Sequence, residues 1–160
     1  MIDLHNIDIR LVMPNDKDSL EILMKELIEE KGEKFIEKRY EWGLLRRVYD
    51  PLQRHGIFVA EDKVTKQVIG MIFGELRVDP YGETECYIKQ MFVKPEFRKQ
   101  GIGKKLLSIY LNHLKTINIS KVKINLHMDS VKTKALLNDF KFEPKYVVME
   151  LNLNEYERSK

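Results

Sequence analysis

Hydrophobic and polar side chains follow two different periods along this chain, and the period changes near residue 56. Residues 7–12 alternate apolar with polar side chains, which predicts a half-buried strand. Apolar residues then recur every three or four positions, which predicts an amphipathic helix that ends at Gly32. The residues of this stripe are Leu20, Leu23, Met24, Leu27 and Ile28. A second helix is predicted from Glu33 to about Tyr49, because Asp50 precedes a proline and therefore disfavours helical geometry.

The second part of the chain is rich in β-forming residues. Segments 57–62 and 67–78 predict two strands, and the polar stretch between them predicts a hairpin. A turn over 79–82, with Pro80 in its second position, leads to a strand over 86–93. The next helix should bury Leu106, Leu107, Tyr110, Leu111 and Leu114. The last predicted elements are a strand over 121–128, a helix over 131–139 and a closing strand over 145–153.

This order, β-α-α-β-β-β-α-β-α-β, predicts a mixed α/β fold. The sequence contains no internal repeat and no linker, so we predict a single domain over residues 1–160. Hydrophobic residues make up 43% and charged residues 33%, as in soluble globular proteins. A net charge of +3, from 28 basic and 25 acidic residues, is too balanced to indicate a nucleic-acid partner.

Several other classes of protein are disfavoured by the sequence. The apolar runs are strand-sized and the first residues do not resemble a signal peptide, so we expect neither a membrane partner nor export. A single cysteine, Cys86, cannot form an internal disulfide, which favours a cytoplasmic location. The scattered histidines His5, His55 and His113 suggest no metal site. We expect a monomer or a homodimer.

Two glycines within a basic segment give the clearest chemical signal. In "VKPEFRKQGIGKKLL", residues 93–107, a strand is followed by a turn and then by a helix that begins near Gly101. Unpaired N–H groups at a helix start can bind a pyrophosphate, provided that no side chain blocks the approach. A P-loop is excluded, because Arg98 occupies the place of its first glycine and Lys105 follows the lysine. A dinucleotide fingerprint would need a third glycine where Leu106 stands.

The hexapeptide from Arg98 to Gly103 fits the Arg/Gln-x-x-Gly-x-Gly/Ala signature of the GNAT superfamily of N-acetyltransferases. The whole chain resembles this superfamily in the order of its elements. The resemblance implies the GNAT fold, an α/β fold with a mixed, mostly antiparallel sheet, splayed strands four and five, and flanking helices. A second family signature, over residues 130–142, is degraded: Phe142 matches, whereas Ser130, Thr133, Leu137 and Lys141 replace the usual Asn, Ala, Tyr and Gly.

The resemblance implies that acetyl-coenzyme A is the co-substrate and that it lies between the splayed strands. Backbone N–H groups from Lys99 to Lys104 would hold the pyrophosphate, and the main chain at Met91 and Val93 would pair with the pantetheine arm. The N–H of Met91 would also polarise the acetyl carbonyl. The residues expected to bind the cofactor are Met91, Phe92, Val93, Arg98, Lys99, Gln100, Gly101, Ile102, Gly103, Lys104 and Ser130.

Acetyl transfer to an amine by direct attack needs a base, since an ammonium group is not a nucleophile. Where many relatives carry a glutamate on strand four, this chain carries Tyr87, and His127 stands where some N-terminal-amine acetyltransferases pair a histidine with such a tyrosine. These two residues are the candidate catalytic pair, with structural roles as the alternative for both. Glu83 and Glu85 are rival bases, or solvated charges of the turn. Cys86 has no visible base partner, so a buried structural role is expected.

The acceptor and the general acid stay open at this level. A peptide α-amine is weakly favoured by the Tyr87/His127 pair, beside a lysine, a polyamine or a small metabolite amine. The predicted second helix, with Arg39, Trp42, Arg46, Arg47 and Tyr49, suggests an acceptor with carboxylate character, or else a solvated basic face. Leu137 cannot replace the family's acid, a tyrosine. The alternative function is therefore a catalytically lapsed module that binds acyl-coenzyme A.

Overall fold

The computed structural model describes residues 2–126 and 131–157. The chain divides into two compact units, Met1–Ile124 and Asn125–Lys160. The first unit holds a five-stranded sheet of order β1-β2-β3-β4-β5. Its strands are β1 (Ile7–Leu11), β2 (Ile57–Asp62), β3 (Val68–Val78), β4 (Thr84–Val93) and β5 (Lys121–Ile124). All neighbours pair antiparallel except β4 and β5, which run parallel. This mixed, mostly antiparallel sheet confirms the predicted fold class.

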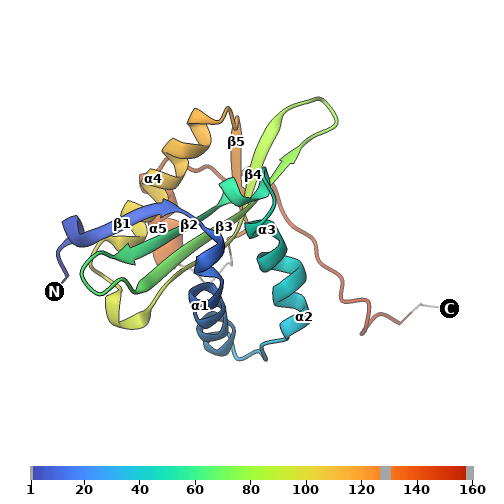
Figure 1. Ribbon diagram of the computed structural model, residues 1–160. Coiled ribbons are helices and arrows are strands. Elements are labelled where there is room, and N and C mark those ends of the chain that lie inside the picture. Colours follow the sequence, from blue (N-terminus) through green and yellow to red (C-terminus); the bar gives the residue numbers. More distant parts are fainter. Residues whose placement is uncertain (1, 127–130, 158–160) are drawn as a thin grey trace. The chain divides into compact units, whose positions relative to one another are not determined.

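Helices cover the two faces of this sheet, as Figure 1 shows. One face carries α1 (Lys17–Glu30) and a helical stretch made of α2 (Glu37–Tyr40), a π-helical turn (Glu41–Leu45) and α3 (Arg46–Val48). The other face carries α4 (Ile102–Thr116). The helix predicted from Glu33 therefore begins four residues later, at Glu37. No helix among residues 2–126 and 131–157 is long and apolar enough to cross a membrane.

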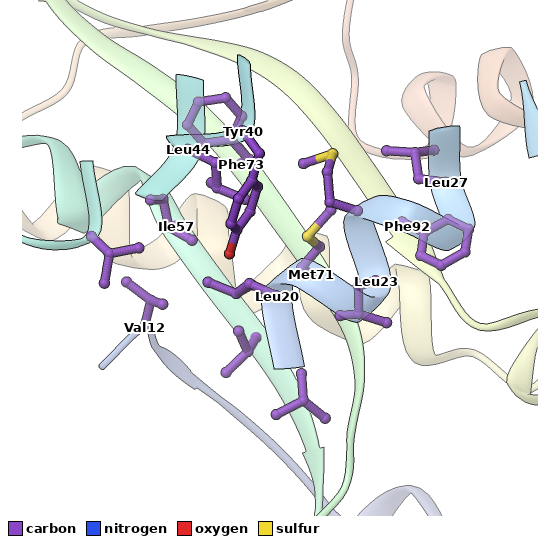
Figure 2. Packing of buried hydrophobic residues seen from close by; sticks show 14 residues of the cluster. Val12, Leu20, Leu23, Leu27, Tyr40, Leu44, Ile57, Met71, Phe73 and Phe92 are labelled. Carbon is purple, nitrogen blue, oxygen red and sulfur yellow. The ribbon is translucent and has the colours of Figure 1, made fainter. Parts of the chain in front are cut away.

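The hydrophobic core between α1 and the sheet is built by the stripe that the sequence predicts. Leu20, Leu23, Met24 and Leu27 are buried, while Ile28 is partly buried at the edge of the cluster. Figure 2 shows Leu20, Leu23 and Leu27 in one cluster with Met71, Phe73 and Phe92 of the sheet and with Tyr40 and Leu44. Because side chains alternate across a strand, Met71 and Phe73 face this core and Ile72 and Gly74 face α4.

The second unit contains α5 (Val131–Asp139), with the bounds expected from the sequence. The strand predicted over 145–153 is wrong, because this segment has no regular secondary structure and its large apolar side chains are exposed. Apolar alternation favours a strand only when a neighbouring strand satisfies its N–H and C=O groups. Similarly, β5 ends at Ile124, four residues before the end of the strand predicted over 121–128.

A histidine pair outside the core makes the stability of the first unit sensitive to pH. The Nδ1 of His55 lies 3.1 Å from the Nε2 of His113 on α4, and the two rings stack. Burial, together with the neighbouring His55, lowers the pKa of His113 below its ordinary value of 6.5. The unfolded chain therefore binds more protons below pH 6.5, and the stabilisation present above that pH is lost as the pH falls.

We expect the urea midpoint of unfolding to be lower at pH 5.5 than at pH 7.5, and His113→Gln to remove most of this difference. Circular dichroism at the two pH values measures both midpoints. His5→Gln, at an exposed histidine, is the matched control and should leave the difference unchanged. An undiminished pH effect in His113→Gln would show that other groups cause it.

Candidate active site

A β-bulge in β4 lies where the pairing of this strand with β5 ends. Phe73 of β3 pairs with Gln90 and Gly74 pairs with Ile88, so Lys89 is an extra residue on β4. A bulge bends its strand and increases the local twist. The parallel pairing with β5 ends at the same point, with Ile88 opposite Ile124. Beyond the bulge, β4 continues to Val93 and no described strand pairs with that edge.

The edge of β4 beyond the bulge, with which no described strand pairs, presents main-chain donors. Lys94 donates its N–H to the carbonyl oxygen of Ile69 in the direction of β3, at 2.9 Å. Because successive N–H groups of a strand point in opposite directions, those of Met91 and Val93 point away from β3, towards the unpaired edge. The carbonyl oxygen of Val93 accepts a hydrogen bond from Nε of Arg98 at 2.7 Å. The edge can therefore accept an extended ligand as an additional strand.

Immediately beyond this edge, α4 begins with unpaired amides. The first hydrogen bond of the helix runs from the Lys105 N–H to the Gly101 carbonyl oxygen. Gly101 has φ of 88° and makes no side-chain cap. Among the described residues, the N–H groups from Gly101 to Lys104 donate to no backbone carbonyl. A Cβ atom at Gly103 would have open space within 4 Å. These amides, at the positive end of the helix dipole, suit a phosphate group.

The basic side chains around this helix start are used in different ways. The guanidinium of Arg98 binds Glu30 of α1 bidentately, at 3.0 and 2.7 Å. Lys105 donates to the carbonyl oxygens of Leu4 and Ile7. Lys99 and Lys104 are exposed and have no ion-pair partner among the described residues. The exposed lysines can therefore contribute charge to a bound phosphate, while Arg98 and Lys105 hold the loop in place.

Tyr87 lies two residues before the bulge, on the face of the sheet that α1–α3 cover. Tyr87 pairs with Glu75 of β3. Glu75 follows the core residue Phe73 by two positions, so the two residues lie on the same face of the strand. Arg77 and Lys89 place their cationic groups 4.6 and 4.3 Å from the centre of the Tyr87 ring. The ring is thus held in a positive environment beside the point where β4 and β5 separate.

The rival acids are engaged in ion pairs. Glu85 is buried and binds both Arg77, at 3.4 Å, and Lys123, at 2.7 Å. Glu83 binds Lys121 at 2.5 Å. Both carboxylates therefore already have cationic partners within the protein. Glu75, which sequence reasoning did not select, contacts Arg47 at 3.4 Å. Only the strand register, which is invisible in the sequence, places Glu75 opposite Tyr87.

The remaining candidate site residues differ in their positions and surroundings. His127 and Ser130 lie outside the described residues. Leu137 is buried, with 5% of its surface exposed, and its carbonyl oxygen accepts from the N–H groups of Phe140 and Phe142. Cys86 is fully buried beside the Tyr110 hydroxyl, at 3.2 Å, and burial raises the pKa of its thiol to about 11. Such a thiol stays protonated at neutral pH and is not a nucleophile. No cluster of metal-binding side chains occurs within residues 2–126 and 131–157.

A shallow pocket of about 480 Å³ opens on the helical stretch after α1. It is lined by Trp42, Arg46, Arg47, Tyr49, Asp50, Pro51 and Gln53. Gln53 anchors the pocket to the sheet, since its side chain donates to the Leu76 carbonyl oxygen and accepts from the Leu76 N–H, at 2.7 and 3.0 Å. Arg47 reaches from the pocket wall to Glu75. The pocket therefore adjoins the sheet face that carries Tyr87.

Comparison with known proteins agrees with this geometry. The family model for the acetyltransferase (GNAT) family matches residues 18–142. No curated protein matches the sequence. A possible acetyltransferase from Clostridium difficile 630 has 19% identity and a TM-score of 0.77, covering 92% of this chain and 97% of its own.

Two further solved structures have the same fold. A predicted acetyltransferase from Clostridium acetobutylicum, determined with acetyl-CoA, has 22% identity and a TM-score of 0.74, covering 95% of this chain and 99% of its own. An aminoglycoside acetyltransferase from an uncultured soil metagenomic sample, in complex with sisomicin, has 17% identity and a TM-score of 0.74. It covers 93% of this chain and 97% of its own. At these identities the structural similarity establishes the fold.

Proposed function

Because this chain belongs to the acetyltransferase (GNAT) family, we propose that it transfers the acetyl group of acetyl-coenzyme A to a primary amine by direct attack. The observation that carries the proposal is the continuity of two main-chain features. The unpaired edge of β4 at Met91 and Val93 leads directly to the unpaired amides of Gly101–Lys104. Together they offer donors for an extended arm that leads to a pyrophosphate, as the pantetheine arm of coenzyme A does.

The residues present fit this co-substrate, and most of their contributions come from the backbone. The co-substrate supplies an acetyl thioester. The amides of Gly101–Lys104 would hold its pyrophosphate, with Lys99 and Lys104 adding charge. The N–H groups of Met91 and Val93 would bind the pantetheine arm. The Met91 N–H would also donate to the acetyl carbonyl oxygen as negative charge develops there, which lowers the barrier of acyl transfer.

Tyr87 and His127 are the proposed proton acceptors for the incoming ammonium group. Two observations support Tyr87: it adjoins the bulge, and its rivals Glu83 and Glu85 are held in ion pairs. The cationic groups of Arg77 and Lys89 lie over the Tyr87 ring and fix its position beside the bulge. The proton would pass from the amine to Tyr87, directly or through water, and His127 would be its partner.

We expect Tyr87→Phe to lower kcat/KM at least about 100-fold, the usual contribution of a general base. Thiol release from acetyl-coenzyme A with a panel of amines and peptides measures it, and calorimetry should give an unchanged affinity for acetyl-coenzyme A. Tyr81→Phe, at an exposed tyrosine of the neighbouring turn, is the matched control. A Tyr87→Phe enzyme with full activity would assign the proton transfer to another group.

The acceptor class is the finer part of the proposal. A peptide α-amine is supported by the Tyr87/His127 pair alone. A structural neighbour is an aminoglycoside acetyltransferase determined in complex with sisomicin, which supports an aminoglycoside as the alternative acceptor. An acceptor panel that contains peptides, polyamines and aminoglycosides separates these classes by their rates of thiol release.

A module that binds acyl-coenzyme A without turnover is the second candidate. It is supported by Leu137, because a buried leucine stands where the family carries its acid. The same assay distinguishes the two functions. Thiol release above the no-acceptor background supports the enzyme, whereas tight binding of acetyl-coenzyme A without release from any acceptor supports the module.

A further inference from the structure

We propose that Arg46, presented on the ring of Trp42 by the π-helical turn, binds an anionic group of the acceptor and so selects amines that carry a carboxylate. This inference rests on the proposed function for its meaning in catalysis. The binding step itself can be measured without acetyl transfer. It concerns the pocket that Trp42, Arg46, Arg47, Tyr49 and Asp50 line.

The π-helical turn exposes the aromatic wall of this pocket. Residues Glu41–Leu45 form a π-helical turn between two α-helical turns. Such turns are rare in proteins, and those that occur often lie at functional sites. Leu44, inside the turn, is buried in the core, while 67% of the Trp42 surface is exposed. An exposed tryptophan that does not complete the core is unusual in a soluble domain, and here it forms one side of a pocket.

The two arginines of the pocket, Arg46 and Arg47, differ in their contacts with the rest of the protein. Arg47 donates to the carbonyl oxygen of Gly43 at 2.7 Å, contacts Glu75 at 3.4 Å and covers the Phe73 ring at 5.3 Å. The guanidinium of Arg47 is therefore already occupied by contacts within the protein. Arg46 stacks on Trp42, with 4.3 Å between its guanidinium carbon and the ring centre. Among the described residues, Arg46 makes no ion pair and is exposed.

Stacking on an aromatic ring fixes the orientation of a guanidinium group without occupying its hydrogen-bond donors. The N–H groups lie in the plane of the group, so an arginine that covers an aromatic ring keeps its fork of donors for a planar anion. A carboxylate is the matching acceptor, since it binds such a fork bidentately. Asp50, the acidic residue of the pocket, accepts from the backbone N–H groups of Leu52 and Gln53. Those hydrogen bonds lower the pKa of Asp50 and hold it as the cap of the next turn.

The location of the pocket connects anion binding to the reaction. Arg47 joins the pocket wall to Glu75, and Glu75 lies opposite Tyr87. An acceptor whose carboxylate binds Arg46 would extend its amine along this face of the sheet towards Tyr87. A short acidic peptide carries both the amine and the carboxylate that this arrangement calls for.

The test uses Trp42 as the probe, because it is the only tryptophan of the chain. Its fluorescence is titrated at constant ionic strength with the peptide amides Gly-Asp and Gly-Gly-Asp, and with Gly-Asn and Gly-Gly-Asn, which lack the carboxylate. We expect saturable changes with the aspartyl peptides, and affinities at least about tenfold weaker for the asparaginyl peptides. Arg46→Gln should weaken binding of the aspartyl peptides about tenfold, and Arg46→Lys should restore part of it.

Arg39→Gln is the matched control, since it removes an exposed arginine of the same helical stretch that does not line the pocket. Urea unfolding of each variant verifies that the fold is intact. Equal binding of aspartyl and asparaginyl peptides, unchanged binding in Arg46→Gln, or no binding at all would overturn the inference. Selective binding without thiol release would support the anion site while rejecting the proposed acetyl transfer, so the two failures are distinguishable.

Discussion

Gly103→Glu is expected to weaken the binding of acetyl-coenzyme A at least about 100-fold while leaving the protein folded. A Cβ at this position enters open space beside the unpaired amides of α4. The glutamate side chain would compete for these amides and repel the phosphates. The loss of two charge-assisted hydrogen bonds costs about 3 kcal/mol or more, which corresponds to this factor. Isothermal titration calorimetry with acetyl-coenzyme A measures the effect.

The sign of the stability change makes this variant informative. A glutamate in the first turn favours the helix through its dipole, and replacing glycine raises helix propensity. Urea unfolding should therefore show unchanged or slightly higher stability. Asn112→Glu adds the same charge to an exposed site further along α4 and is the matched control. An unaltered affinity in Gly103→Glu would show that the amides at the start of α4 do not bind the co-substrate.

Gly56→Ala is expected to be the most destabilising of these substitutions, with a loss of about 3 kcal/mol or more in the free energy of unfolding. A Cβ at Gly56 would overlap the backbone carbonyl oxygen of Gly74. A backbone atom of a central strand cannot rotate away, so β3 itself must shift. The carbonyl oxygen of Gly56 also accepts a hydrogen bond from the buried Tyr110 hydroxyl at 2.8 Å, and that contact would be disturbed.

Gly43→Ala provides the matched control for this effect. It is the same chemical change, but a Cβ at Gly43 meets nothing within 4 Å, and the residue lies in a helical stretch. The expected change is a gain of about 0.5 to 1 kcal/mol. Denaturation in urea, followed by circular dichroism, measures both variants. A loss below 1 kcal/mol for Gly56→Ala would mean that β3 accommodates the methyl group.

Sequence reasoning predicted the elements whose signals are local. The stripe from Leu20 to Leu27 and the break at Gly32 defined α1, because helical periodicity and a glycine with positive φ act within a few residues. The closing strand over 145–153 failed for the opposite reason. A strand depends on a partner distant in the sequence, and apolar residues alone do not supply one.

The same division holds for the site. The sequence by itself predicted the chemistry of the helix start, since Gly101 and Gly103 place no side chain over the first amides of α4. Only the tertiary structure decided that Lys89 is an extra residue opposite β3, that Arg98 and Lys105 are engaged elsewhere, and that Arg46 rather than Arg47 is available. Strand register and side-chain partners join residues far apart in the chain, and no local pattern encodes them.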